Sequence, residues 1–323
     1  MNKASPVAQT ATHLGMGTGM THCVFGKNAE AALQAVKSEA ARLESLLSCY
    51  RPESEISRIN RSAGVQSERM SQDTYEVLAH AARFSTVCGG LFDVTIGPLV
   101  ALWDYKNRSD LPEAARIREV LPLVHHQDLL LNSDAGTAEL RRSGQSIDLG
   151  GIGKGYASAK ILEVFKSFEV VSAYTNIGGN VAALGTKPDG TLWSVGIQHP
   201  RQENRLIGAV SIADKAVVTS GDYQRYFVDR SGKRRHHILD PRTGYPAESG
   251  LASVTVVADD ATAADALSTI LFLAGMSQGM ELLQRFSGAE AILVDTDMTV
   301  FVTPGLRNHF QTEAGTRVYI LNA

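Results

Sequence analysis

The densest group of polar side chains lies between Gly232 and Tyr245, in the run Gly-Lys-Arg-Arg-His-His-Ile-Leu-Asp-Pro-Arg-Thr-Gly-Tyr. Histidine exchanges protons near neutral pH, and arginine binds phosphate oxygens through its forked guanidinium group. A charged turn at Asp-Pro-Arg-Thr-Gly, beside an exposed strand end, would explain the same residues. The concentration of histidine and arginine favours the functional interpretation by a modest margin.

A glycine-rich segment runs from Asp148 to Tyr156, Asp-Leu-Gly-Gly-Ile-Gly-Lys-Gly-Tyr, between an expected strand and an expected helix. Glycines let backbone N–H groups approach an anion, and a helix N-terminus adds partial positive charge. The segment is not a Walker A loop, because Lys154 is followed by Gly155, and it does not fit a dinucleotide-binding fingerprint either. A tight turn and an anion cradle explain it about equally well, and Lys154 and Asp148 favour the cradle slightly.

A third signal is the pair Asp265 and Thr269, which lies one turn apart on one face of the helix expected at 262–274. A carboxylate and a hydroxyl are hard oxygen ligands, which suit Mg²⁺ bound together with substrate phosphate and water. Taken alone, an ordinary solvated stripe is the commoner explanation. Together the three segments predict a Mg²⁺-dependent enzyme acting on a nucleotide or another diphosphate.

These segments are positioned by the helices and strands that the sequence predicts. Apolar residues spaced by three and four predict helices at 29–50, 72–87, 156–168, 262–274 and 281–285. Short apolar runs predict a hairpin over 138–149 and strands at 170–176, 181–184, 192–197, 207–212, 216–219, 253–257, 289–295, 299–303 and 317–321. Because strands come in adjacent groups, the expected fold class is α+β with a largely antiparallel sheet. Residues 1–15 are expected to form a flexible tail and residues 16–323 a single domain.

Composition excludes several classes of protein. The chain has 323 residues, is 44% hydrophobic and carries a formal charge of −3, which excludes a disordered chain or a disulfide-stapled miniprotein and argues against a nucleic-acid partner. Three cysteines, none at metal-ligand spacing, favour a reducing compartment. No signal-peptide run or membrane-spanning window is evident in the sequence. The expected location is the cytoplasm, and the alternative is an exported protein whose leader is absent.

Several segments, taken in order, resemble the ApbE family, the FAD:protein FMN transferases. They are Met16-Gly-Thr18, Ser48-Cys-Tyr50, Ser54-Glu-Ile-Ser-Arg-Ile-Asn60, Phe92-Asp-Val-Thr-Ile-Gly-Pro-Leu99, Asp148 to Tyr156, Asn176-Ile-Gly-Gly-Asn180, Ser220-Gly-Asp-Tyr223, His237 to Gly244 and Ala264-Asp-Ala-Leu-Ser-Thr269. The resemblance implies a T-fold-related architecture. It also implies an enzyme that takes FAD as donor, uses Mg²⁺, and attaches FMN through its phosphate to a Thr or Ser hydroxyl of an acceptor flavoprotein, releasing AMP.

The resemblance implies roles for individual residues as well. Those expected to contact the flavin or line its cleft are Met16, Tyr50, Leu91, Phe92 and Asp93. Those expected to contact FAD elsewhere are Asp148, Lys154 and Leu239. The metal would be held by the Gly151 carbonyl, Asp265 and Thr269. His237 would lie near the scissile phosphate, and either His237 or Asp240 would accept the proton of the acceptor hydroxyl.

One departure concerns the metal, because position 268 is Ser where some relatives place Asp. The ion would then have one fewer anionic ligand and one more water. The sequence leaves two other functions open. A metal-dependent FAD pyrophosphatase would need the same residues, whereas a non-catalytic FAD-binding protein would not need the Asp265 and Thr269 pair.

Overall fold

The computed structural model describes residues 7–105, 107 and 110–321. Its centre is a nine-stranded sheet, whose strands in spatial order are β1 (Ala8–Gly15), β2 (Thr18–Phe25), β6 (Ala173–Ile177), β7 (Asn180–Leu184), β10 (Ala216–Gly221), β13 (Leu251–Ala258), β14 (Glu290–Asp295), β15 (Val300–Val302) and β17 (Val318–Ile320). All neighbours are antiparallel except β15 and β17. The α+β class with a largely antiparallel sheet is therefore confirmed.

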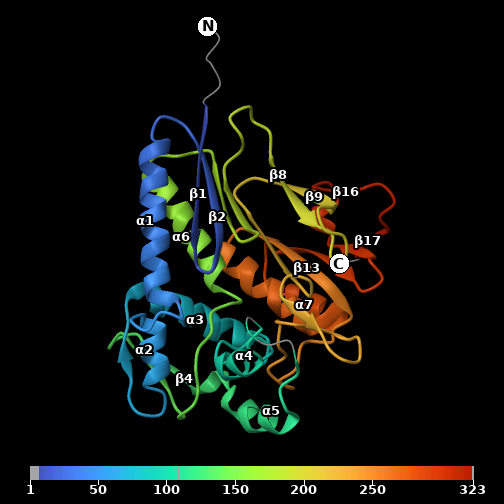
Figure 1. The fold of residues 1–323 in the computed structure, drawn as a ribbon. Coiled ribbons are helices and arrows are strands. Elements are labelled where there is room, and N and C mark those ends of the chain that lie inside the picture. The colour runs from blue at the N-terminus through green and yellow to red at the C-terminus, as the bar shows by residue number, and fades with distance from the viewer. Residues whose placement is uncertain (1–6, 106, 108–109, 322–323) are drawn as a thin grey trace.

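Three long helices cover one face of this sheet (Figure 1): α1 (Ala29–Leu47), α6 (Gly153–Ser167) and α7 (Ala261–Leu283). In α1 the apolar residues spaced by three and four are buried, as the pattern predicts. The α7 helix packs on β10 and β13, and α6 packs between α1 and α7. This arrangement places the N-termini of α6 and α7 side by side.

A smaller sheet covers the opposite face. It contains β8 (Trp193–Gln198), β9 (Leu206–Ile212) and β16 (Phe310–Thr312) in the order β16-β9-β8. A second apolar core, which includes Trp193, Val210 and Val257, joins the two sheets. Because both faces of β13 are covered, all eight of its residues are buried, which explains why its sequence is a continuous apolar run.

A helical lobe lies below the sheet in Figure 1. Its elements are α2 (Glu55–Arg61), β3 (Glu68–Arg69), α3 (Gln72–Val87), α4 (Gly97–Trp103), α5 (Ala114–Val120), β4 (Leu129–Asn132) and β5 (Thr137–Leu140). A two-stranded ribbon, β11 (Tyr226–Val228) with β12 (Arg234–His236), contacts this lobe through the rings of Phe227, Trp103 and Tyr105. Short 3₁₀ turns occur at Leu121–Leu123, His126–Asp128 and Pro304–Leu306.

The structure corrects two expectations about chain organisation. Residues 8–15 are not a tail, because they form β1 and pair with β2 along their whole length. Of the rest of the expected tail, Val7 is exposed and precedes β1, and residues 1–6 lie outside the described residues. The run is short of large apolar side chains because only one face of this edge strand packs inward. The hairpin expected over 138–149 is also wrong, since β5 pairs with β3 and β4 and Ser146 makes only an isolated bridge to Ile96.

The α7 element consists of two helical segments that meet at Gly275, whose φ of 72° and ψ of −174° are not helical. The first segment therefore ends where the sequence predicts, and a second segment follows directly up to Leu283. By length and composition alone α7 is apolar enough to cross a membrane, although the sequence analysis found no such window. Its apolar surface is used within the fold, against α6, β10 and β13, so packing in the core accounts for its composition.

Candidate active site

The site is built where the first turns of α6 and α7 meet. The Gly155 N–H donates to Asp265 Oδ2 at 2.8 Å, which links the two helices directly. A Cβ atom at position 155 would lie 2.3 Å from the Ala261 carbonyl oxygen and 2.5 Å from Asp265 Cβ. Only glycine permits this approach, so the last glycine of the glycine-rich segment brings Asp265 to the loop.

A group of hydroxyls continues from Asp265 along α7. Thr269 follows one turn later, and its Oγ1 lies 3.2 Å from Ser220 Oγ at the end of β10. Ser268 Oγ donates to the Asp265 carbonyl at 2.8 Å and lies 2.8 Å from Ser220 Oγ. Ser268 is therefore held by two neighbouring groups.

The Gly151 backbone lies against the same group. A Cβ at this position would lie 3.0 Å from the Phe92 ring and 3.3 Å from Thr269 Oγ1. Lys154 Nζ donates to the Gly150 carbonyl at 3.2 Å and lies 4.0 Å from Asp265 Oδ1. The loop thus places one lysine and a tightly packed glycine backbone around the start of α7.

The predicted metal ligands are one carboxylate, one hydroxyl and one backbone carbonyl. Among the residues that the structure describes, no group of three or more His, Cys, Asp or Glu side chains is arranged to hold a metal ion. The set of Gly151, Asp265 and Thr269 is not a group of that kind, but all its donors are hard oxygens. Such a set suits Mg²⁺, which leaves further positions for phosphate oxygens and water.

His237 follows β12 and has a buried ring nitrogen. Within the described part of the chain, its Nδ1 has no hydrogen-bond partner. Burial, followed by the positive charges of Arg225, His236 and Lys154, lowers the pKa of His237 to about 3. The imidazole is therefore neutral at physiological pH and has a lone pair available for a proton.

Asp240 and Leu239 lie near His237 in sequence but have other contacts. Arg242 donates to both carboxylate oxygens of Asp240, at 2.8 Å from Nη2 to Oδ2 and at 3.0 Å from Nε to Oδ1. Leu239 is buried with Leu99, Trp103 and Ile117. Of the two predicted proton acceptors, Asp240 is therefore engaged by Arg242, whereas His237 Nδ1 has no hydrogen-bond partner among the described residues.

Met16 and Tyr50 approach the loop from two other directions. Met16 and Gly17 have φ values of 50° and 71°, as a tight β1 to β2 hairpin turn requires, and Met16 Cε lies 3.8 Å from a Cβ position on Gly153. Tyr50 is 67% exposed, yet burial of its hydroxyl end, followed by the charge of Asp148, raises its pKa to about 12. Both residues thus border the glycine-rich segment.

Asp148 itself is held by two contacts. Its Oδ1 accepts from the Gly150 N–H at 2.7 Å, and its Oδ2 accepts from Cys49 Sγ at 3.5 Å. Burial and the charge of Asp148 raise the pKa of the Cys49 thiol to about 12. The sequence analysis assigned Cys49 no role in the site, although its place beside Tyr50 in the Ser-Cys-Tyr motif was a signal.

The three buried residues before α4 have different positions. Phe92 contacts the Gly151 backbone, whereas Leu91 is 2% exposed and belongs to the core. Asp93 Oδ1 accepts from the Thr95 N–H at 2.8 Å and from its hydroxyl at 2.7 Å, and burial raises the pKa of this carboxyl. Of the three, Phe92 therefore has the most direct contact with the glycine-rich segment.

One hollow in the described structure lies apart from the predicted site residues. It has a volume of about 370 Å³ and is lined by Ala82, Thr86, Gly89, His126, Gln127 and Leu129. None of the predicted site residues lines it. The site is defined here by convergent polar groups on α6, α7, β10 and the segment after β12.

Comparisons with known proteins show the family of the chain. The model of the ApbE family matches residues 16–293. The chain is 35% identical to the FAD:protein FMN transferase of Klebsiella pneumoniae, over 87% of each protein, and 33% identical to that of Treponema pallidum, over 85% of this chain and 80% of the relative.

Solved structures give the same result. The ApbE protein of Thermotoga maritima superposes with a TM-score of 0.86 at 30% identity, covering 94% of this chain and 99% of that one. The flavinyl transferase ApbE of Pseudomonas stutzeri, in its apo form, superposes with a TM-score of 0.85 at 29% identity, covering 97% and 100%. The chain belongs to the ApbE family.

Proposed function

We propose that this protein is an FAD:protein FMN transferase that requires Mg²⁺. The proposal is supported by relatives of that name, which match most of the chain. The observation that carries it is the convergence of Lys154, Asp265 and Thr269 on the glycine-rich loop: Lys154 at Gly150, Thr269 at Gly151 and Asp265 at Gly155. Cationic and hard-oxygen groups gathered in this way suit a diphosphate substrate.

In the proposed reaction the hydroxyl oxygen of an acceptor Thr or Ser attacks the phosphorus on the riboflavin side of FAD. The bond between that phosphorus and the bridging oxygen breaks, and the bridging oxygen leaves on AMP. The products are a phosphodiester between riboflavin and the acceptor side chain, together with AMP. The hydroxyl proton passes to a base and then to solvent, so one FAD and one acceptor give one AMP.

His237 is assigned as the proton acceptor. Its neutral imidazole has a buried nitrogen without a protein partner within the described chain, whereas Asp240 is occupied by Arg242. A pKa of about 3 makes His237 a weak base whose protonated form readily releases the proton again, so it accepts the hydroxyl proton only as the phosphorus–oxygen bond forms and then passes it to solvent. Lys154 contributes positive charge close to the same group.

The hard-oxygen set of Gly151, Asp265 and Thr269 is assigned to Mg²⁺. When bound there, the ion neutralises negative charge on the diphosphate and on the leaving AMP. The protein groups that orient the set are the Gly155 N–H, which bonds Asp265, and the Ser220 hydroxyl beside Thr269. These contacts orient the two side chains, which lie one turn apart on α7.

The flavin end of FAD is assigned to the side of the loop bordered by Met16, Tyr50 and Phe92. Tyr50 offers a largely exposed aromatic face, which suits stacking on an isoalloxazine ring. Leu91, Asp93 and Leu239 are buried, so we assign them to the protein wall of the flavin site. Asp148 holds the loop through Gly150 and borders Tyr50.

The test is to incubate the protein with FAD and Mg²⁺, with and without an acceptor flavoprotein that carries a Thr or Ser flavinylation site, in water enriched in ¹⁸O. The transferase predicts AMP release that depends on acceptor, with no heavy oxygen in any FMN product. Free FMN that contains ¹⁸O, formed equally without acceptor, would replace the proposal with a pyrophosphatase. FAD binding without AMP release under all conditions would indicate a binding protein.

A further inference from the structure

Arg225 faces the candidate site although none of the sequence motifs includes it as a site residue. The ribbon pairs Tyr226 with His236, and the next pair joins Arg225 to His237 through a 3.0 Å bond from the His237 N–H to the Arg225 carbonyl. Residues directly opposite in an antiparallel pair project their side chains to the same face. The guanidinium group of Arg225 and the imidazole of His237 therefore lie on one face of the ribbon.

The electrostatic effects agree with this placement. After burial, Arg225 is the largest influence lowering the pKa of His237, and it opposes the rise in the pKa of Tyr50. Lys154 also acts on His237, from α6. Two cations on separate elements thus act on one neutral histidine and border the proposed position of the diphosphate.

Most other cations of the ribbon have carboxylate partners. Arg235 pairs with Asp229 at 2.7 Å, Arg234 lies 3.8 Å from Asp222, and Lys233 pairs with Glu248. Arg225 is exposed, and no carboxylate among the described residues lies within ion-pair distance of it. A cation left without an anionic partner beside a group of phosphate-binding residues is suited to an anionic ligand.

We propose that Arg225 binds the oxygens of the riboflavin-side phosphate of FAD, next to His237, and stabilises the negative charge that moves across this phosphate during transfer. The inference rests on the proposed function, because that function identifies the anion. Arginine suits the position because its planar fork can bind two phosphate oxygens at once. A lysine would keep the charge and lose the second contact.

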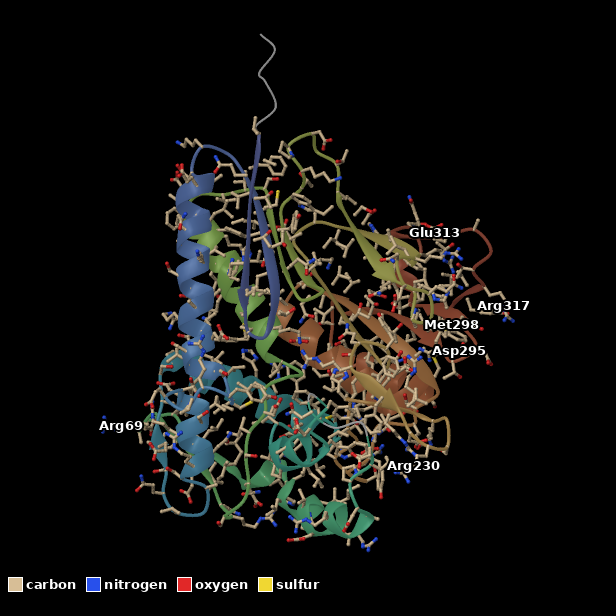
Figure 2. The ribbon with its side chains drawn as sticks, viewed as in Figure 1. Arg69, Arg230, Asp295, Met298, Glu313 and Arg317 are labelled. Atoms are coloured by element: carbon tan, nitrogen blue, oxygen red, sulfur yellow. The ribbon has the colours of Figure 1, made fainter. Side chains whose placement is uncertain are left out.

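The ribbon also supplies a matched control. Arg230 lies in the loop that joins β11 to β12, is exposed, and sits at the outer edge of the molecule in Figure 2. It too lies beyond ion-pair distance of every carboxylate in the described part of the chain. Arg230→Gln removes the same charge from the same ribbon without affecting the face that carries His237.

The experiment measures equilibrium binding of FAD and of riboflavin, by flavin fluorescence with Mg²⁺ present, to the wild type, Arg225→Gln, Arg225→Lys and Arg230→Gln. A charged hydrogen bond to phosphate predicts a loss of FAD affinity of about 10- to 100-fold in Arg225→Gln. Arg225→Lys should lose less, and riboflavin, which has no phosphate, should bind all four proteins equally. Arg230→Gln should match the wild type for both ligands.

Two results would overturn the inference: FAD affinity in Arg225→Gln equal to that of Arg230→Gln, or an equal loss for riboflavin, which would indicate a distorted ribbon. Turnover gives a second readout, since a transition-state role predicts a fall in kcat beyond the change in KM for FAD. Failure of the proposed function is distinct from both. It would be seen in the wild type, as FAD binding without transfer to acceptor, and the binding ratios would still decide the role of Arg225.

Discussion

Replacing Asp265 by asparagine separates the metal-binding role of this residue from its structural role. Asp265 is 3% exposed, and one of its oxygens accepts the Gly155 N–H at 2.8 Å. Asparagine has the same shape and keeps a carbonyl oxygen for that bond, but it loses the negative charge. Because metal catalysis supplies several kcal/mol of transition-state stabilisation, Asp265→Asn should lower kcat/KM at least about a hundredfold.

Alanine at the same position should have a second effect. It leaves the buried Gly155 N–H without its acceptor, which costs about 1–3 kcal/mol of unfolding free energy. For a chain of this size that corresponds to a fall in Tm of about 2–6 °C, whereas Asp265→Asn should change Tm much less. Thermal unfolding of the two variants therefore measures the contribution of the Gly155–Asp265 contact to stability, and AMP release measures the contribution of Asp265 to metal-dependent activity.

Asp260→Asn is the control for this pair. Asp260 precedes α7 and caps it by accepting the Thr262 N–H at 2.9 Å, a role that asparagine fills equally well. It removes one negative charge five residues before Asp265 and should leave activity unchanged. Asp265→Asn with normal AMP release at moderate Mg²⁺, or with a loss equal to that of Asp260→Asn, would refute the metal assignment.

The other predictions concern catalysis, flavin binding, helix packing and pH. His237→Gln should lower kcat about a hundredfold with little change in KM for FAD, and unchanged steady-state kinetics would remove it from the mechanism. Tyr50→Ala should weaken FAD binding about tenfold while Tyr50→Phe does not, as measured by fluorescence titration; equal affinities would place the stacking elsewhere. Gly155→Ala should destabilise the protein in a thermal melt by about 1–3 kcal/mol, whereas Gly153→Ala, where a Cβ meets only ordinary contacts, should not. Burial lowers the pKa of His22 to about 4. Between pH 6.5 and pH 4, His22 is therefore protonated in the unfolded chain and neutral in the folded chain. Stability is then fully present above pH 6.5 and falls by about 3 kcal/mol as pH drops to 4; a His22→Gln variant with an unchanged pH profile of urea unfolding would contradict this.

The parts of the fold with strong periodicity could be predicted from the sequence. The helix predicted at 72–87 coincides with α3 (Gln72–Val87). The strand predicted at 253–257 lies within β13 (Leu251–Ala258). The β1 strand could not be predicted, because an edge strand with one packed face contains few large apolar residues. Gly275 interrupts α7 as predicted, but the sequence did not show that a second helical segment follows it directly.

The residues of the candidate site could likewise be predicted only in part. The Asp265 and Thr269 pair was evident from helical spacing, and the glycine-rich segment from its composition. The contact between Gly155 and Asp265 joins residues 110 positions apart, so no local pattern indicates it. Arg225 was missed for the same reason, since its position depends on the register of a short ribbon that the sequence did not predict.

The central claim is that FMN is transferred from FAD to a protein hydroxyl. The most direct measurement is the intact mass of a purified acceptor flavoprotein after incubation with this protein, FAD and Mg²⁺, with AMP quantified in the same sample. We predict an acceptor mass gain of one FMN less one water, matched by one AMP, and no gain when the acceptor Thr or Ser is replaced by alanine. An unmodified acceptor in the presence of AMP and free FMN would contradict the account.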